Sequence, residues 1–189
     1  MAQQVTETLL TPEVQALIGQ STDVHEMYDV VDKETLRRFA NSIPDQDPRY
    51  WDEELAGPRF GGVATTPVMV SFIAGRRPPW VEDNLHETLL EDWFRDGGGG
   101  GKGRPTGRTL TPVRSLAGTR SHLHTGDEVE LYRYPRIGDK IFNQTSYSDI
   151  QEKRSRSGRL MLMVTTETRY WNQDDDLIMV FRTTGMDMR

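Results

Sequence analysis

The stretch Glu128-Val129-Glu130-Leu131-Tyr132 alternates charged and apolar residues, and alternation returns over Lys140 to Ile150. Two further segments, Leu160 to Trp171 and Leu177 to Thr184, are rich in β-branched and apolar residues. A period of two places successive side chains on opposite faces of a strand. The C-terminal half therefore predicts three or four long antiparallel strands, joined by short turns as a meander.

Turn residues separate these strands. Pro135 to Asp139 and Asn172 to Asp176 are polar segments that contain proline, glycine, asparagine or aspartate. A charged segment, Glu152 to Arg159, is expected to form a hairpin tip between the two central strands. The strand pattern begins near Ser121.

Two helices are expected before the strands. The first is Asp32 to Ile43, where Asp32 suits the N-cap and Pro44 stops the helix. The second runs from Pro67 to Ala74 as a buried helix of about two to three turns, because proline suits a first helical turn. Helices followed by strands predict an α+β domain. The expected apolar face of the first helix consists of Leu36, Phe39, Ala40 and Ile43.

Composition and length narrow the class of protein. The 189 residues are expected to form one domain, residues 1–189, with 35% hydrophobic and 28% charged residues. No apolar run reaches the roughly 18 residues of a membrane span, and residues 1–20 lack the features of a secretory signal. The absence of cysteine excludes disulfides and thiolate metal sites and fits a cytoplasmic location. A net charge of −6 argues against a nucleic-acid partner.

The first predicted helix leads directly into Asp45-Gln46-Asp47-Pro48-Arg49-Tyr50-Trp51-Asp52. Aspartate followed by an Asp-Pro pair is ordinary turn chemistry, so a purely structural role is one interpretation of this octet. Five other short segments follow the octet along the chain. They are Phe60 to Pro67, His124 to Glu128, Arg136 to Asp139, Glu152 to Arg159, and Tyr170 to Asp174.

The order and spacing of these segments resemble the N-terminal, FAS1-like dehydratase half of MaoC-like hot-dog proteins. The resemblance implies an α+β hot-dog fold, in which an antiparallel sheet wraps around a central buried helix. It also implies hydration or dehydration of a 2-enoyl or 3-hydroxyacyl thioester of coenzyme A or acyl-carrier protein. That chemistry needs a base, an acid and a donor that polarises the thioester carbonyl.

The chain departs from the catalytic members of this family. They place a histidine five residues after the aspartate, in an Asp-x-Asn-Pro-x-His pattern, whereas Tyr50 and Asp47 stand at the histidine and asparagine positions here. A tyrosine with a pKa of about 10 is a poor base near neutrality. At the start of the buried helix, Pro67 has no N–H to donate. Asp45 alone remains of the catalytic set.

These departures, with the lack of an internal repeat, imply an accessory subunit whose catalytic Asp/His pair lies on a partner hot-dog subunit. No cofactor beyond the thioester carrier is expected. Asp45 and Tyr50 would be a vestigial catalytic pair. The acyl pocket is expected to be lined by Tyr50, Trp51, Phe60, Gly61, Gly62, Ala64, Thr65 and Thr66.

Two other groups of polar residues have competing interpretations. The basic residues of the hairpin tip either are solvated charges or contact coenzyme A phosphates. His122 and His124 lie two apart on a predicted strand, which is half of a metal site, but no third ligand is evident and no metal is predicted. The basic residues are Lys153, Arg154, Arg156 and Arg159.

The glycine run at Gly97 to Lys102 does not match a phosphate-binding loop, because Asp96 and Gly103 occupy required positions. Residues 95–108 are therefore expected to be a flexible surface loop. Two alternative functions stay open. One is a homo-oligomeric hot-dog thioesterase that uses Asp45 as a base, and the other is a non-catalytic acyl-CoA-binding module.

Overall fold

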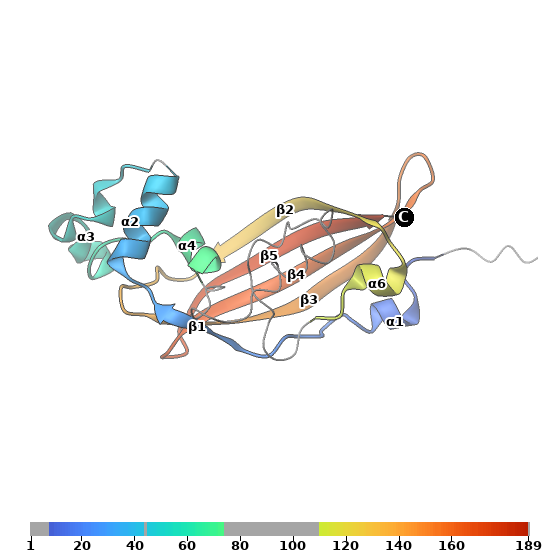
Figure 1. The fold of residues 1–189 in the computed structure, drawn as a ribbon, viewed down its shortest axis with the longest axis horizontal. Helices are drawn as coiled ribbons and strands as arrows, with labels where there is room; N and C mark the ends of the chain where they lie inside the picture. The colour runs from blue at the N-terminus through green and yellow to red at the C-terminus, as the bar shows by residue number, and fades with distance from the viewer. Residues whose placement is uncertain (1–7, 44, 74–109, 189) are drawn as a thin grey trace, which may run out of the picture.

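The computed structural model describes residues 8–43, 45–73 and 110–188. A five-stranded antiparallel sheet dominates the chain, with the strand order β1-β3-β4-β5-β2 (Figure 1). Three or four long strands were predicted, and the described residues contain four. The strands are β1 (His25–Val30), β2 (Ser121–Leu131), β3 (Lys140–Arg154), β4 (Leu160–Asn172) and β5 (Leu177–Met188).

The sheet differs from the predicted meander at both edges. Strands β3, β4 and β5 follow one another as hairpins, as expected, but β2 pairs with β5 rather than with β3. The chain therefore crosses the sheet between β2 and β3. At the other edge, β1 pairs with β3 and was not predicted, because it is only six residues long and mostly exposed.

The helices gather at the two ends of the sheet (Figure 1). Near the C-terminal end of β2 lie α2 (Lys33–Ser42), η1 (Pro48–Tyr50), α3 (Glu53–Phe60) and α4 (Pro67–Ile73). Near its N-terminal end lie α1 (Pro12–Gln15) and α6 (Val113–Ala117). The predictions of α2 and of α4 starting at Pro67 are confirmed, whereas α3 and α6 were missed.

Helix α2 follows the predicted capping with one exception on its apolar face. The Asp32 side chain accepts a hydrogen bond from the Thr35 N–H at 2.8 Å, as an N-cap should. Leu36 and Ala40 are buried, but Ile43 is 46% exposed. The expectation for Ile43 was wrong because the helix ends at Ser42 and this residue is its C-cap.

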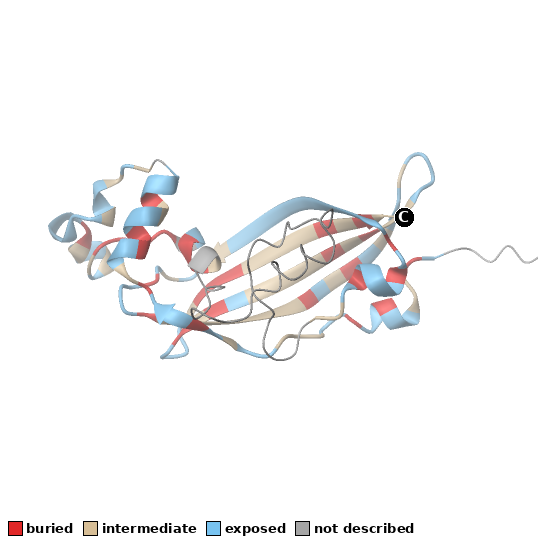
Figure 2. Cartoon of the chain, viewed as in Figure 1, coloured by how far each residue is buried: buried red, intermediate tan, exposed pale blue. Residues whose placement is uncertain are grey.

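Two buried clusters form the core, one at each end of the sheet (Figure 2). The first contains Met69 and Val70 of α4 together with Ile178 and Met179 of β5. The second contains Leu162 of β4 together with residues of α1 and α6. The helices therefore pack against one face of the sheet, at its two ends.

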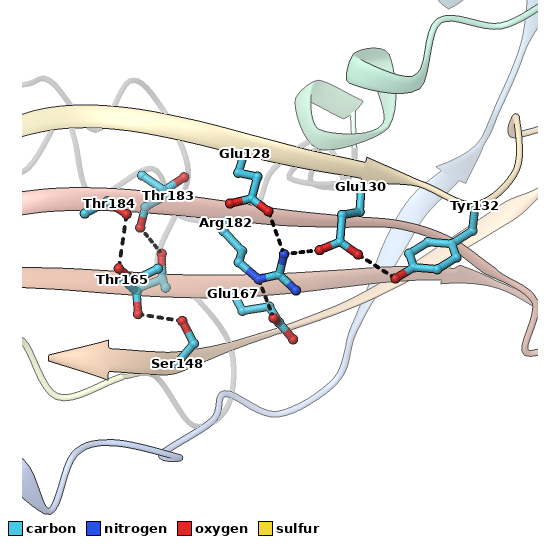
Figure 3. Close-up of polar contacts among 10 residues, drawn as sticks. Glu128, Glu130, Tyr132, Ser148, Thr165, Glu167, Arg182, Thr183 and Thr184 are labelled. Carbon is cyan, nitrogen blue, oxygen red and sulfur yellow. Dashed lines mark hydrogen bonds and ion pairs between the residues drawn. The ribbon is translucent and has the colours of Figure 1, made fainter.

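The opposite face carries a charge network that links three strands. The Arg182 guanidinium of β5 donates hydrogen bonds to two carboxylates of β2 and one of β4 (Figure 3). The acceptors are Glu128 and Glu130 on β2 and Glu167 on β4. The hydrogen bonds that Arg182 donates to Glu130 and Glu167 raise the pKa of its guanidinium further above the usual range. Cross-strand pairs of opposite charge favour one register, so this network helps to align edge strand β2 with the sheet.

The sequence also led to expectations about membrane-spanning segments and about a glycine-rich loop. In the described part of the chain, no helix is long and apolar enough to cross a membrane. The predicted loop at residues 95–108 and the glycine run at Gly97 to Lys102 lie outside the described residues, as does Pro44.

The second core cluster yields a test of the packing. We expect Leu162→Ala to lower the free energy of unfolding by about 2–5 kcal/mol, because Leu162 is fully buried and its truncation leaves a cavity. Urea denaturation of the purified chain measures this change. The control is Leu55→Ala in α3, where the side chain is 54% exposed. Its expected change is within about 0.5 kcal/mol, and equal losses in the two variants would contradict the packing described.

Candidate functional site

The octet 45–52 folds as a series of side-chain caps. Asp47 is the N-cap of η1 and accepts a hydrogen bond from the Arg49 N–H at 3.0 Å. Asp52 caps α3 by accepting from the Leu55 N–H at 3.0 Å. Two of the three aspartates of the octet therefore act as helix caps. The structural interpretation of the octet accounts for Asp47 and Asp52.

Asp45 and Tyr50 form a direct pair. The Tyr50 hydroxyl donates a hydrogen bond to Asp45 Oδ2 at 2.7 Å, and Asp45 Oδ1 accepts from the Asp47 N–H at 3.2 Å. Tyr50 also packs against the core cluster of α4. Burial and the hydrogen bond to Asp45 together raise the pKa of Tyr50 to about 12. At neutral pH this phenol is therefore a hydrogen-bond donor, and each carboxylate oxygen of Asp45 already accepts one bond.

Asp47, which stands at the asparagine position of the catalytic pattern, is ionised. The Arg49 guanidinium donates to both of its oxygens, with Nε at 2.9 Å from each. This hydrogen bonding lowers the pKa of Asp47 to about 2. An asparagine supplies an amide N–H₂ donor, whereas this carboxylate only accepts. The substitution therefore removes a donor from this turn.

The expected pocket-lining residues divide into exposed and buried groups. Trp51 is 62% exposed and Phe60 is half-buried, with its ring edge-on to Tyr134 at a centroid distance of 4.9 Å. Gly61 is the C-cap of α3 and has a left-handed backbone conformation, with φ 73°. The next residue, Gly62, is half-buried. The chain then becomes buried at Val63 and stays buried through Thr66.

Residues 63–66 are held between the octet and the β2–β3 connection. The Ala64 N–H donates to the Arg49 carbonyl at 2.8 Å, and the buried Thr65 hydroxyl donates to the Pro135 carbonyl. The Thr66 Oγ1 is buried and has no hydrogen-bond partner among the described residues. It lies directly before Pro67, the first residue of α4, which lacks an N–H. The structure thus brings Asp45, Tyr50 and segment 60–66 to one end of the sheet.

The basic residues of the hairpin tip lie at the opposite end of the sheet from Asp45 and Tyr50 (Figure 1). Lys153, Arg154, Arg156 and Arg159 are all exposed at or beside the turn between β3 and β4. The Arg154 guanidinium donates to the Gly158 carbonyl at 2.8 Å. Within one chain, these residues and the octet do not form a single site.

The two histidines of β2 pair with different carboxylates. His122 Nδ1 lies 2.6 Å from Asp187 Oδ1, and His124 Nε2 lies 3.2 Å from Asp127 Oδ2. They lie on the same face of the strand, as expected. Among the described residues, no group of three or more His, Cys, Asp or Glu side chains is arranged to hold a metal ion. The His122–Asp187 pair was not predicted, because the two residues are 65 positions apart in the sequence.

Comparisons with known proteins agree on one group of relatives. Residues 16–93 and 108–181 match the family described as "FAS1-like, dehydratase domain region". None of the curated proteins matches this chain significantly.

Solved structures extend the likeness to most of the chain. The ChsH1-ChsH2 complex from Mycobacterium tuberculosis contains a chain with 16% identity and a TM-score of 0.70, covering 93% of this chain and 91% of that one. A MaoC-like dehydratase from Rhodospirillum rubrum has 18% identity and a TM-score of 0.53, with coverage of 89% and 92%. The HadBC (3R-hydroxyacyl-ACP dehydratase) complex from M. tuberculosis contains a chain with 18% identity and a TM-score of 0.50, covering 87% of this chain and 95% of that one. These likenesses confirm the predicted α+β hot-dog fold.

The raised pKa of Tyr50 leads to a spectroscopic test. We expect the Tyr50 phenol to stay protonated at about pH 11, where an ordinary tyrosine with a pKa of about 10 is largely ionised. Since the folded pKa lies above the unfolded one, the linked part of the stability is present below about pH 10 and is lost as the pH rises toward 12. NMR titration of ¹³Cζ-labelled tyrosine measures the ionisation, with Tyr50→Phe to assign the signal. Ionisation of Tyr50 at about pH 10 would refute the hydrogen-bonded pair.

Proposed function

Because this chain belongs to the FAS1-like, dehydratase domain region family, we propose that it is an accessory subunit of a heteromeric enoyl-CoA hydratase/3-hydroxyacyl-thioester dehydratase. Its substrate would be a 2-enoyl or 3-hydroxyacyl thioester of coenzyme A or acyl-carrier protein. The catalytic base and acid would come from a second hot-dog subunit. This chain would shape the acyl pocket.

The Asp45–Tyr50 hydrogen bond is the observation on which this proposal depends. A general base needs a pKa near the working pH and a free lone pair directed at the proton it removes. The phenol of Tyr50, with a pKa of about 12, does not meet the first condition. Its hydroxyl proton points to Asp45 Oδ2 at 2.7 Å, so the two groups satisfy each other. The pair resembles a structural contact more than a catalytic one.

Two of the similar structures are described as complexes of two differently named chains, ChsH1-ChsH2 and HadBC. The HadBC complex is described as a 3R-hydroxyacyl-ACP dehydratase. Both descriptions favour, for this chain as well, a division of roles between two hot-dog subunits. They are consistent with a partner that contains the missing histidine.

The edge strand β2 is the surface we propose for this partner. Among the described residues, β2 is paired on one side alone, by β5, and Leu123, Val129 and Leu131 are 50%, 41% and 38% exposed. Long unpaired edges with apolar side chains are rare in isolated proteins, because they favour pairing with another chain. An added antiparallel strand would extend the sheet across the interface.

Such pairing would also bring together the two halves of the expected site. The basic hairpin tip lies near the N-terminal end of β2, since Met188 pairs with both Ser121 and Met161. In an antiparallel pair, this end faces the C-terminal end of the partner's edge strand. In this chain the C-terminal end is the one beside α4 and the octet (Figure 1). Lys153, Arg154, Arg156 and Arg159 would therefore approach the partner's catalytic end, where the coenzyme A phosphates are expected.

A test of the proposal compares a substitution of Asp45 in this chain with a substitution of the partner's catalytic histidine. The chain is co-expressed with a hot-dog subunit that contains an intact Asp-x-Asn-Pro-x-His pattern, and hydration of crotonyl-CoA is assayed. We expect Asp45→Asn to change kcat by less than about twofold, whereas substituting the partner's catalytic histidine should lower it by roughly 10²–10⁴-fold. Thiol release is measured in the same reactions. An equally large loss from Asp45→Asn would place catalysis on this chain, and thiol release without hydration would favour a thioesterase.

The edge strand supplies a separate test of the interface. We expect Leu123→Lys to weaken assembly with the partner by at least about tenfold, because a lysine on an edge strand opposes pairing. Tyr28→Lys is the matched control, since Tyr28 is equally exposed, at 52%, on the opposite edge strand β1. Light scattering after size-exclusion chromatography measures the mass of the complex. Loss of assembly in the control, with normal assembly of Leu123→Lys, would place the interface on β1.

A further inference from the structure

A pocket of about 350 Å³ lies at the end of the sheet opposite to Asp45 and Tyr50. Strands β2, β3, β4 and β5 form its floor, and the start of α6 forms one wall. Its volume falls within the range of small-molecule sites, roughly 300–1,000 Å³. The apolar part of the lining comes from Pro112, Val113, Val164 and the ring of Tyr147. The polar part comes mainly from His122, Asp187 and Arg114.

His122 is held in one orientation by a buried carboxylate. Asp187 is only 4% exposed, and its Oδ1 lies 2.6 Å from His122 Nδ1. A carboxylate accepts, so the imidazole places a proton on Nδ1, and Nε2 is left for another partner. The His122 side chain remains 51% exposed. The carboxylate therefore orients a ring whose second nitrogen is accessible from the pocket.

Gly185 makes room for this ring. A Cβ atom built on Gly185 would lie 2.4 Å from His122 Cε1 and 3.0 Å from Nε2, so any other residue would displace the imidazole. Glycine weakens the interior of a strand and often marks a close approach by another group. Here it lies within β5, two residues before Asp187 and on the same face. The strand thus accommodates the histidine at the position where the carboxylate can hold it.

Arg114 adds a positive charge to the same pocket. It lies in α6, is exposed, and forms no ion pair with the described residues. The Tyr147 hydroxyl is engaged, since it donates to the Thr111 carbonyl at 3.1 Å. Two groups therefore remain to bind a ligand oxygen, namely His122 Nε2 and the Arg114 guanidinium.

We propose that this pocket binds a short acyl group, whose oxygen atoms contact His122 Nε2 and Arg114 and whose hydrocarbon part contacts Val113, Val164 and Tyr147. The chemistry fits both a free short-chain acid and the acyl part of a thioester. The site belongs to this chain alone, so it does not depend on a partner or on the proposed catalytic role. It is a second ligand site, separate from Asp45, Tyr50 and residues 60–66.

Imidazole NMR of the full chain tests the site directly. The ¹H–¹³C signals of His122 are followed while crotonate or crotonyl-CoA is added. We expect a saturable shift of the His122 signal and a much smaller change at His124, which lies on the same strand outside the pocket. A response to crotonate alone identifies the free acid as the ligand, and a response to crotonyl-CoA identifies the thioester.

Variants separate the proposed contacts from general effects. By isothermal titration calorimetry, which does not need the His122 signal, we expect His122→Gln, Asp187→Asn and Gly185→Ala each to weaken binding of the responding probe at least tenfold, a difference of about 1.4 kcal/mol. His124→Gln is the control and should leave affinity unchanged. The wild-type titration needs no variant, so it decides the question even if one of them fails to fold. The absence of a saturable His122 shift with both probes, or full affinity in a folded His122→Gln variant, would overturn the proposal.

Discussion

The antiparallel pairing of β4 with β3 on one side and β5 on the other determines the position of nearly everything else in the chain. This three-stranded ladder runs over the full length of the strands, from Ile141 opposite Asn172 to Arg154 opposite Leu160. Its alternation puts the buried clusters on one face and the Arg182 network on the other. The helices pack at the two ends of the buried face. The ladder thereby separates the octet from the basic hairpin tip by the length of the sheet.

This separation explains why a single chain does not assemble the site that its motifs suggest. At one end, Asp45 and Tyr50 satisfy each other, and α4 begins at Pro67, which has no N–H to donate. At the other end are the basic tip and the His122 pocket. Strand β2, at the edge of the sheet in the described part of the chain, runs between the two ends. An antiparallel partner strand is the simplest arrangement that would place complementary ends of two hot dogs beside each other.

Much of the fold could be predicted because the relevant signals are local. The period of two in the long strands, the N-cap at Asp32 and the proline at the start of α4 each depend on neighbouring residues. The family resemblance, rather than a local pattern, paired Asp45 with Tyr50, and the hydrogen bond between them was not predicted. The pairing of Tyr50 with Asp45 spans only five positions.

Features that depend on long-range contacts were missed. Strand β2 was expected beside β3, but its register is set by residues of β5 more than 50 positions away, including the pair of Glu130 with Arg182. Helix α3 was missed because it contains Pro58 and a glycine, the two residue types with the lowest helix propensity. The His122–Asp187 contact exists only because β2 and β5 are neighbours. A glycine in an otherwise regular strand, Gly185, was the one local sign of it.

We propose that this chain has lost the catalytic base of its family. The most direct measurement is the hydration rate of crotonyl-CoA with the purified chain alone, before and after Asp45→Asn. We expect no rate above the uncatalysed background in either protein, because the Tyr50 phenol, with a pKa of about 12, cannot serve as a base near neutrality. Turnover by the wild-type chain that disappears in Asp45→Asn would contradict this proposal.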